Sequence, residues 1–173
     1  MKKALMTLLS VAGLFAATIS QADIIPWTAS LDQAQEAGSP VTVPGATGTA
    51  FGNIDTGSGL LDWNIAWSGL SGPAFAMHFH LAPPGANGGV QVNIGAISGL
   101  GSPSIGAAVI TPAQIADLLA GLWYINIHTA LNPGGEIRGQ VSRVTATVPE
   151  PGTLALLGLG LAGMGLSRRR RKV

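Results

Sequence analysis

The three histidines of the chain fall in two segments with the alternating pattern of β-strands. His78 and His80 lie in residues 74–81, where they alternate with apolar residues, and His128 lies in residues 123–129. Successive side chains point to opposite faces of a strand, so His78 and His80 share one face with their Cα atoms about 7 Å apart. Neutral imidazoles are ligands that suit Cu(II) and Zn(II). If the two strands are neighbours, His78, His80 and His128 form a copper or zinc site.

A structural polar network is the alternative interpretation of the same strand faces. The residues that would form it are Asn126, His128, Glu136 and Arg138. The histidines would then hydrogen-bond to Glu136, Asn126 or the backbone, and Glu136 would pair with Arg138 to hold the sheet edges in register. Polar side chains in folded proteins are usually satisfied in this way. We therefore expect the network and no cofactor, with copper or zinc as the alternative.

Catalysis is a weaker interpretation of these residues. The chain has no cysteine, and its serines lack the Gly-x-Ser-x-Gly turn that exposes a hydrolase nucleophile. Asp55 and Asp62 flank a predicted turn, where solvation is expected rather than the paired-carboxylate chemistry of a hydrolase. We therefore predict that the protein is not an enzyme.

Short apolar segments separated by Gly, Pro, Asn and Ser clusters predict the scaffold. The strand candidates are residues 27–31, 47–54, 60–67, 74–81, 90–94, 123–129 and 136–147. Many short strands with turn residues between them are typical of an antiparallel β-sandwich or barrel. One short helix is expected after Thr111, because Thr111 and Gln114 form a capping box around Pro112. The prediction is an all-β fold with one short helix.

Alternation along the strands also predicts the core. In residues 74–81 the apolar side chains on one face are Phe75, Met77, Phe79 and Leu81. The four tryptophans, Trp27, Trp63, Trp67 and Trp123, occupy strand positions as well. Exposed tryptophans stack on sugars, but at alternating strand positions they are more often part of the core.

The first 22 residues have the three parts of a secretory signal peptide. Two lysines precede an uncharged apolar stretch at residues 4–19, and a small-x-small signal peptidase site ends at Ala22. This order is typical of a cleaved export signal. We expect cleavage after Ala22, which leaves residues 23–147 as the folded, exported domain.

Residues 148–173 form a tail of three parts. The motif Val148, Pro149, Glu150 and Pro151 is followed by an uncharged apolar stretch, residues 153–166, and then by five consecutive cations. Cations after an apolar helix hold that end at the cytoplasmic face of the membrane. The apolar stretch has 14 residues, whereas a stable transmembrane helix needs about 20. We therefore expect a hydrophobic helix at each terminus of the chain, with the C-terminal one anchoring the protein only transiently in the inner membrane.

The Val-Pro-Glu-Pro motif and the order of the three parts resemble the PEP-CTERM sorting signal of Gram-negative envelope proteins. The resemblance implies that an exosortase-type membrane peptidase recognises and processes the tail. It also implies a route through the inner membrane to the periplasm, the outer surface or the extracellular matrix. Exopolysaccharide or an envelope protein would be the partner there.

The positive charge of the chain is concentrated in its terminal segments. The formal net charge of the whole chain is +1, but residues 23–150 contain two cations, Arg138 and Arg143, and eight acidic residues, which gives −6. So few cations cannot neutralise a phosphate backbone, which excludes nucleic acid as a partner. Because the chain has no cysteine, stability must come from packing and backbone pairing, and thiol chemistry is excluded.

Several segments of the predicted domain together resemble a CHRD domain. They are residues 76–81, 111–121, 124–129 (Tyr-Ile-Asn-Ile-His-Thr) and 135–140 (Gly-Glu-Ile-Arg-Gly-Gln). The resemblance runs from about Trp27 to Val144 and implies a fold similar to the antiparallel Greek-key sandwich of Cu/Zn superoxide dismutase. That enzyme binds copper through a similar His-x-His strand, but the rest of its ligand set has no counterpart that the sequence places here. We expect an exported envelope domain with a binding or structural role and, as the alternative, a metal-binding, redox-protective domain.

Overall fold

The computed structural model describes residues 22–38 and 45–145; residues 1–21, 39–44 and 146–173 are not described. The elements of the described part are, in chain order, β1 (Ile24–Asp32), β2 (Thr47–Asp55), β3 (Leu60–Ser68), β4 (Ala74–Leu81), β5 (Gly89–Asn93), α1 (Ile94–Ser98), β6 (Ser104–Val109), α2 (Pro112–Leu119), β7 (Trp123–Thr129), β8 (Ile137–Gln140) and β9 (Ser142–Arg143). The observed strand pairs are antiparallel, which confirms the predicted all-β class.

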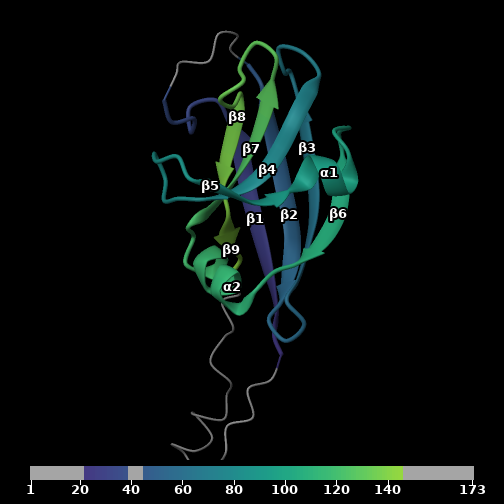
Figure 1. The fold of residues 1–173 in the computed structure, drawn as a ribbon, viewed down its shortest axis with the longest axis vertical. Helices are drawn as coiled ribbons and strands as arrows, with labels where there is room; N and C mark the ends of the chain where they lie inside the picture. Colours follow the sequence, from purple (N-terminus) through teal and green to yellow (C-terminus); the bar gives the residue numbers. More distant parts are fainter. Residues whose placement is uncertain (1–21, 39–44, 146–173) are drawn as a thin grey trace, which may run out of the picture.

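The strands form one sheet that bends into two half-sheets, which are joined along β1 by β8 and β9 (Figure 1). Their order is β5-β4-β7-β8-β1-β2-β3-β6, and β9 pairs with β1. Between β8 and β1 the paired residues are Arg138 and Asp32, whereas β1 and β2 pair along their whole length. Phe79 of β4 contacts Trp27 of β1 and Trp63 of β3, so the β5-β4-β7-β8 half lies against the β1-β2-β3-β6 half as the second layer of a sandwich. The neighbours β4–β7 and β3–β6 are not consecutive in sequence, as in Greek-key connections.

An aromatic cluster joins the two half-sheets. The ring centroid of Phe79 on β4 lies 5.8 Å from that of Trp27, 5.7 Å from Trp63 and 5.8 Å from Trp123. All four side chains are at most 1% exposed, and Trp67 is partly buried against the same core. Offset and edge contacts between aromatic rings add about 0.5–1.5 kcal/mol per pair to the burial of their area. The tryptophans are therefore core residues, as expected, and do not form an exposed sugar-stacking surface.

Glycines make room for two of these indole rings. Gly52 lies opposite Trp27 in the β1–β2 ladder, and Gly106 lies opposite Trp63 in the β3–β6 ladder. A Cβ atom on Gly106 would lie 2.8 Å from Cζ2 of Trp63, closer than real Cβ contacts allow. The large side chains of β1 and β3 thus fit over positions of β2 and β6 that carry none.

The two helices differ in how well the sequence predicts them. The capping box of α2 forms as predicted, with the Gln114 backbone N–H donating to Thr111 Oγ1 at 3.3 Å and the Thr111 backbone N–H donating to Gln114 Oε1 at 2.9 Å. The single predicted helix is an incomplete description, because α1 was not expected. Asn93 caps α1 by accepting from the Ala96 backbone N–H at 3.0 Å, but the glycine and isoleucines of α1 are poor helix formers. This helix packs against β4 and β6, on the side where the half-sheets do not pair (Figure 1).

Phe75 departs from the predicted alternation of β4. Met77 and Phe79 are fully buried and Leu81 is partly buried, as predicted, whereas Phe75 is 52% exposed. The β4–β7 register is irregular between Ala74 and Ala76. An irregularity of this kind interrupts the two-residue period, so Phe75 does not share the core face of the residues that follow it.

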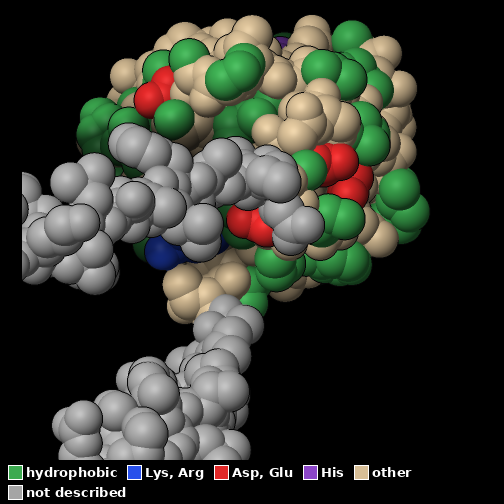
Figure 2. All heavy atoms as spheres, turned by 90° about the horizontal axis from the view of Figure 1, so that it is seen from below, with side chains coloured by type: hydrophobic (Ala, Val, Ile, Leu, Met, Phe, Trp, Pro, Cys, Tyr) green, Lys and Arg blue, Asp and Glu red, His purple; other side chains and the backbone are tan. Residues whose placement is uncertain are grey.

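The two ends of the described domain lie side by side. Trp27 pairs with Arg143, and the Val144 backbone N–H donates to the Pro26 carbonyl at 2.8 Å. Figure 2 views the molecule from this end, where acidic side chains are exposed near a small basic patch. The first and last described residues of the domain therefore lie at one pole of the sandwich (Figure 1).

The predicted targeting segments fall outside the described residues, apart from Ala22. This applies to both terminal hydrophobic helices and to the motif residues Val148, Pro149, Glu150 and Pro151. Cleavage after Ala22 and the domain limits 23–147 stay predictions. No helix in the described part of the chain is long and apolar enough to span a membrane.

Candidate metal centre and its polar surroundings

The outer face of β7 lies beneath loops. Tyr124, Asn126 and His128 point away from the Phe79 cluster, yet they are at most 9% exposed. The segments that hydrogen-bond to these three residues or contact them are residues 33–38, 83–88 and 130–135. The strand face that alternation predicts to be polar is therefore buried beneath loops, although it is not part of the apolar core.

The three histidines meet on this face. In the β4–β7 ladder His78 lies opposite Asn126 and Ala76 lies opposite His128, which places all three imidazoles over two neighbouring strands. One nitrogen from each of His78, His80 and His128 lies within 4.8 Å of the other two. The nearest pair is Nδ1 of His78 and Nε2 of His128, at 3.4 Å. The structure thus brings together the three ligands that the sequence singled out.

Backbone carbonyls determine the tautomers of two rings. Nδ1 of His80 lies 2.9 Å from the Gly88 carbonyl oxygen, and Nδ1 of His128 lies 3.0 Å from the Pro133 carbonyl oxygen. A carbonyl oxygen only accepts hydrogen bonds, so each Nδ1 carries the proton and each neutral ring has its lone pair on Nε2. Metal-binding histidines are oriented by hydrogen bonds of this kind.

Nε2 of His80 is a buried acceptor without a donor in the described part of the chain. The ring cannot easily turn away, because it stacks on Tyr124 with centroids 5.0 Å apart and planes 12° apart. The Arg138 guanidinium covers the Tyr124 ring at 3.5 Å from its centroid. An unsatisfied buried polar atom costs about 1–3 kcal/mol, so a ligand for this lone pair would stabilise the domain.

Burial favours the neutral form of all three imidazoles. Loss of hydration lowers the pKa of His78, His80 and His128 below the ordinary value of 6.5. Neighbouring imidazoles lower the pKa of His78 and His128 further, and the Arg138 charge lowers that of His80. Metals bind the neutral ring, so at neutral pH the histidines are in the state that ligation requires.

The separation of His78 and His128 matches that of two ligands on one metal ion. Bonds of about 2.0–2.1 Å at a tetrahedral angle place two ligand nitrogens about 3.3 Å apart. The observed distance between Nδ1 of His78 and Nε2 of His128 is 3.4 Å. The widest separation in the set is no more than 4.8 Å, so ligation by all three rings needs the nitrogens to approach by at most about 1.5 Å.

Glu136 joins two loops beside this cluster. Its side chain is fully buried, and its carboxylate accepts from the Ser71 backbone N–H at 2.6 Å and from Asn132 Nδ2 at 3.1 Å. The Ser71 and Thr129 hydroxyls also donate to it. Burial alone would raise the pKa of Glu136, but these hydrogen bonds outweigh it and the pKa falls below its ordinary value. The ionised carboxylate holds the turn after His128 in place.

Arg138 holds the loop that orients His80. Its side chain is 1% exposed and donates to the carbonyls of Ala86 at 2.7 Å and Pro83 at 3.1 Å. Glu36 approaches from the 33–38 segment and accepts from Asn126 Nδ2 at 3.4 Å. Loss of hydration raises the pKa of Glu36 to about 7, although the Arg138 charge and the Asn126 hydrogen bond lower it.

The predicted polar network forms in part: two imidazoles bond to backbone carbonyls, as one form of the prediction had it, but the expected Glu136–Arg138 pair is absent from the described residues. Glu136 does not pair with Arg138, because its carboxylate turns toward the loops before β8 while the guanidinium reaches the 83–88 loop. The imidazoles bond to backbone carbonyls and to each other, not to Glu136 or Asn126. The loops, rather than a cross-sheet ion pair, supply the hydrogen bonds of this network, although Nε2 of His80 and Oδ1 of Asn126 have no partner among the described residues.

Sequence reasoning missed several residues of this region. They are Glu36, Ser71, Thr129 and Asn132. Most of them lie in loops or at strand ends, where no periodicity marks the direction of a side chain. The one available signal was the position of Asn132 in an Asn-Pro-Gly-Gly turn beside His128, since a short turn returns its residues to the strand it leaves.

Fold and site together define a Greek-key β-sandwich domain with a three-histidine cluster on one covered face. A family model described as CHRD domain matches residues 27–141, and one described as PEP-CTERM protein-sorting motif matches residues 147–171. The chain belongs to the CHRD domain family, which confirms the resemblance of its strand motifs. No curated protein and no solved structure matches it.

The PEP-CTERM match confirms the resemblance of the tail to that sorting signal. The motif implies recognition by exosortase, a membrane protein, and export to the cell surface through the membrane. The chain is therefore an exosortase-sorted extracellular CHRD domain protein.

Proposed function

We propose that this exported CHRD domain binds a copper or zinc ion through His78, His80 and His128. The observation that carries the proposal is the convergence of three ring nitrogens within 4.8 Å. Two of the rings are oriented by backbone carbonyls that accept from Nδ1 and leave the Nε2 lone pairs free for a ligand. A three-imidazole set suits both metals.

The metal-free network explains the same atoms less well. It leaves Nε2 of His80 buried without a donor in the described residues. It also requires a hydrogen bond of 3.4 Å between His78 and His128, longer than the usual range of about 2.7–3.2 Å. A metal ion would accept all three lone pairs at once. These two points favour metal binding over the network that the sequence alone favoured.

The second part of the proposal is that the domain holds the metal and does not use it in catalysis. The group that converges here contains imidazoles and no carboxylate, and its aromatic neighbours are Phe75 and Tyr124. Neither aromatic ring is a ready general acid or base at neutral pH. We infer a non-enzymatic, redox-protective role in which the domain withholds copper or zinc from reactive chemistry outside the cell.

Metal titration of the full chain, purified without a histidine tag, tests this proposal. One equivalent of Cu(II) or Zn(II) should bind and raise the melting temperature, because a ligand that binds only the folded state stabilises it. His80→Phe keeps a ring that can stack on Tyr124 but removes the donor nitrogen. It should lower the affinity by about 100-fold or more.

Phe75→Ala is the matched control for that variant. The Phe75 ring centroid lies 6.2 Å from that of His128 and the side chain is 52% exposed, so its removal alters the rim of the site without removing a ligand. The affinity should stay within about threefold of wild type. Sub-stoichiometric binding without a thermal shift in the wild type, or unchanged affinity in His80→Phe, would contradict the proposal.

The sorting signal in the tail bears on where the domain would bind the metal. Export to the cell surface follows from the sorting motif, and we propose the outer surface or the exopolysaccharide matrix as the final location, with the periplasm as a stage on the route. The net charge of −6 over residues 23–150 supports this setting, because an acidic domain stays soluble and attracts cations weakly.

A further inference from the structure

The free edge of β6 is an unused pairing surface. β6 stands at one end of the strand order and pairs with β3 alone among the described strands. Helix α1 reaches the start of β6 through a 2.7 Å contact between the Ser98 and Ser104 hydroxyls, and residues 105–109 continue beyond it. An edge strand presents a row of backbone N–H and C=O groups that another strand can pair with.

β6 lacks the features that usually protect an edge. Its sequence, Ser-Ile-Gly-Ala-Ala-Val, contains no charge and no proline, and its register against β3 is regular. The opposite edge of the sheet, β5, is different, because its pairing with β4 is irregular between Phe79 and His80. Charges, prolines and bulges are the common means of blocking edge pairing. Of the two sheet edges, β6 is therefore the one suited to accept a strand.

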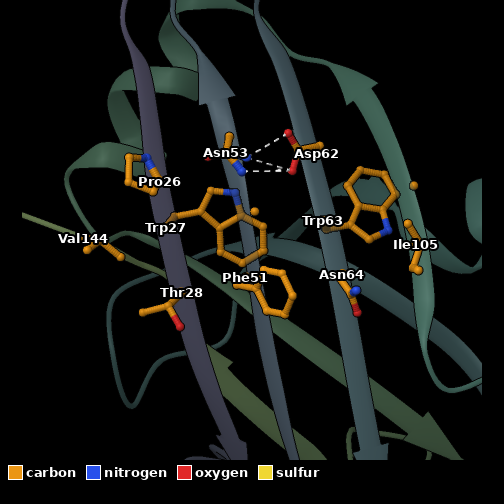
Figure 3. A pocket seen from close by; sticks show the side chains of 12 residues that line it. Pro26, Trp27, Thr28, Phe51, Asn53, Asp62, Trp63, Asn64, Ile105 and Val144 are labelled. Atoms are coloured by element: carbon orange, nitrogen blue, oxygen red, sulfur yellow. Dashed lines mark hydrogen bonds between the residues drawn. The ribbon is translucent and has the colours of Figure 1, made fainter.

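The outward side chains of β6 form an apolar row. Ile105 is 63% exposed, Val109 is 74% exposed, and Ala107 is exposed between them. Leu60, opposite Val109 on β3, is 43% exposed and extends the row. Figure 3 shows Ile105 on the outermost strand, beside Asn64 of β3. The edge thus combines free backbone groups with apolar side chains on one face.

We propose that two copies of this chain pair antiparallel through β6, with Ala107 opposite Ala107 of the second copy. The row is self-complementary in this register, since Ile105 of each copy faces Val109 of the other and the small alanines meet at the centre. Apolar β-branched pairs are favourable cross-strand neighbours. The pairing joins two half-sheets of the order β1-β2-β3-β6 into one continuous sheet.

The acidic charge of the domain does not oppose this contact. Asp62 lies opposite Ala107 on β3, so the two Asp62 residues of the pair would be separated by three strand spacings, about 14 Å. The Debye length at physiological salt is about 8 Å. Repulsion between the Asp62 carboxylates is therefore largely screened, and β6 itself adds no charge. A second copy is thus compatible with the edge in both shape and charge.

The absence of cysteine allows the register to be tested by single-cysteine crosslinking. In the full chain, produced in an oxidising envelope, Ala107→Cys should give a disulfide-linked dimer on a non-reducing gel of the whole culture. Directly opposed strand residues have Cα atoms about 4.5–5.5 Å apart, within the range of a disulfide. Ile105→Cys and Val109→Cys are matched controls, because in this register each is about 14 Å from its own copy. They should give at least tenfold less dimer.

Three further variants keep the test decisive. The double variant Ile105→Cys with Val109→Cys should restore the dimer, because these positions face each other. Adding Val109→Lys to Ala107→Cys should lower the dimer yield about tenfold, whereas Thr49→Lys, exposed on β2, should leave it unchanged. Equal yields from all three single cysteines would show random collision, and the absence of dimer from both Ala107→Cys and the double variant would overturn the proposal.

Discussion

On the outer face of β7, Asn126 and His128 are 2% and 9% exposed, whereas on the outer faces of β2 and β6, Phe51 and Ile105 are 58% and 63% exposed. Both faces are the outer sides of strands whose inner side chains pack into the same core. Three loops cover the first face, while the second carries an open cleft of about 680 Å³ (Figure 3). The same strand pattern therefore produces a buried face in one half-sheet and an open face in the other.

This difference between the faces determines where most of the groups with shifted pKa values lie. Under the loops, Glu36, Glu136 and the three histidines all have shifted pKa values, because burial and a small number of nearby partners determine their ionisation. On the open face, Asp62 accepts from the Asn53 backbone N–H at 3.0 Å, and it is only partly buried. Loops that cover a polar strand face create the kind of environment in which ligands can be tuned.

The largest expected effect comes from Glu136→Ala on the covered face. The variant leaves the donors of Ser71, Thr129 and Asn132 without their carboxylate. Buried hydrogen bonds to a charged group contribute about 1.5–3 kcal/mol each and are not additive, so we expect the free energy of unfolding to fall by about 3–5 kcal/mol. Urea unfolding followed by tryptophan fluorescence measures this.

Asp62→Ala is the corresponding change on the open face. Asp62 also accepts from an asparagine, but in a partly solvated position, where water replaces the lost partner. The expected loss is below about 1 kcal/mol. If Glu136→Ala and Asp62→Ala lowered the free energy of unfolding by similar amounts, the two faces would not differ in the way described.

Gly106→Ala should have an intermediate effect that arises in the shared core. The new Cβ would lie 2.8 Å from Trp63 Cζ2 and 2.8 Å from Ser98 Cβ, so the indole or α1 must shift. Overpacking of this kind costs about 1–3 kcal/mol. Gly101→Ala is the control, because its Cβ would meet nothing within 4 Å. A smaller loss of melting temperature for Gly106→Ala than for Gly101→Ala would argue against the tight Trp63–Gly106 fit.

Glu36 should make the stability of the covered face depend on pH. Burial raises its pKa from 4.5 to about 7 in the folded state, so folding favours the protonated acid. The resulting stabilisation is full below about pH 4.5 and is lost as the pH rises through about 7; its size is of order 1–3 kcal/mol. Glu36→Gln should remove this slope from the free energy of unfolding measured between pH 5 and 8. An unchanged slope would mean that Glu36 is not buried beneath its loop.

Much of the sandwich could be predicted from local patterns. The bounds of β4 and β7 agree with the predicted strands to the residue, because both have a strong two-residue period and clear turns around them. The capping box likewise placed the start of α2. α1 and β6 gave weak signals, since glycine and alanine interrupt both hydrophobic periods. Phe75 was misplaced because a register irregularity depends on the partner strand, not on β4 itself.

The sequence by itself determined that His78 and His80 share a strand face and that the tail carries a sorting signal, because both depend on residues close together in the chain. The tertiary structure alone decided that His128 joins them, that the Gly88 and Pro133 carbonyls orient two rings, and that Glu36 reaches Asn126 across 90 positions of sequence. Strand alternation is a local property with a period of two. Coverage by loops depends on long-range packing, and that packing made a polar face into a candidate metal centre.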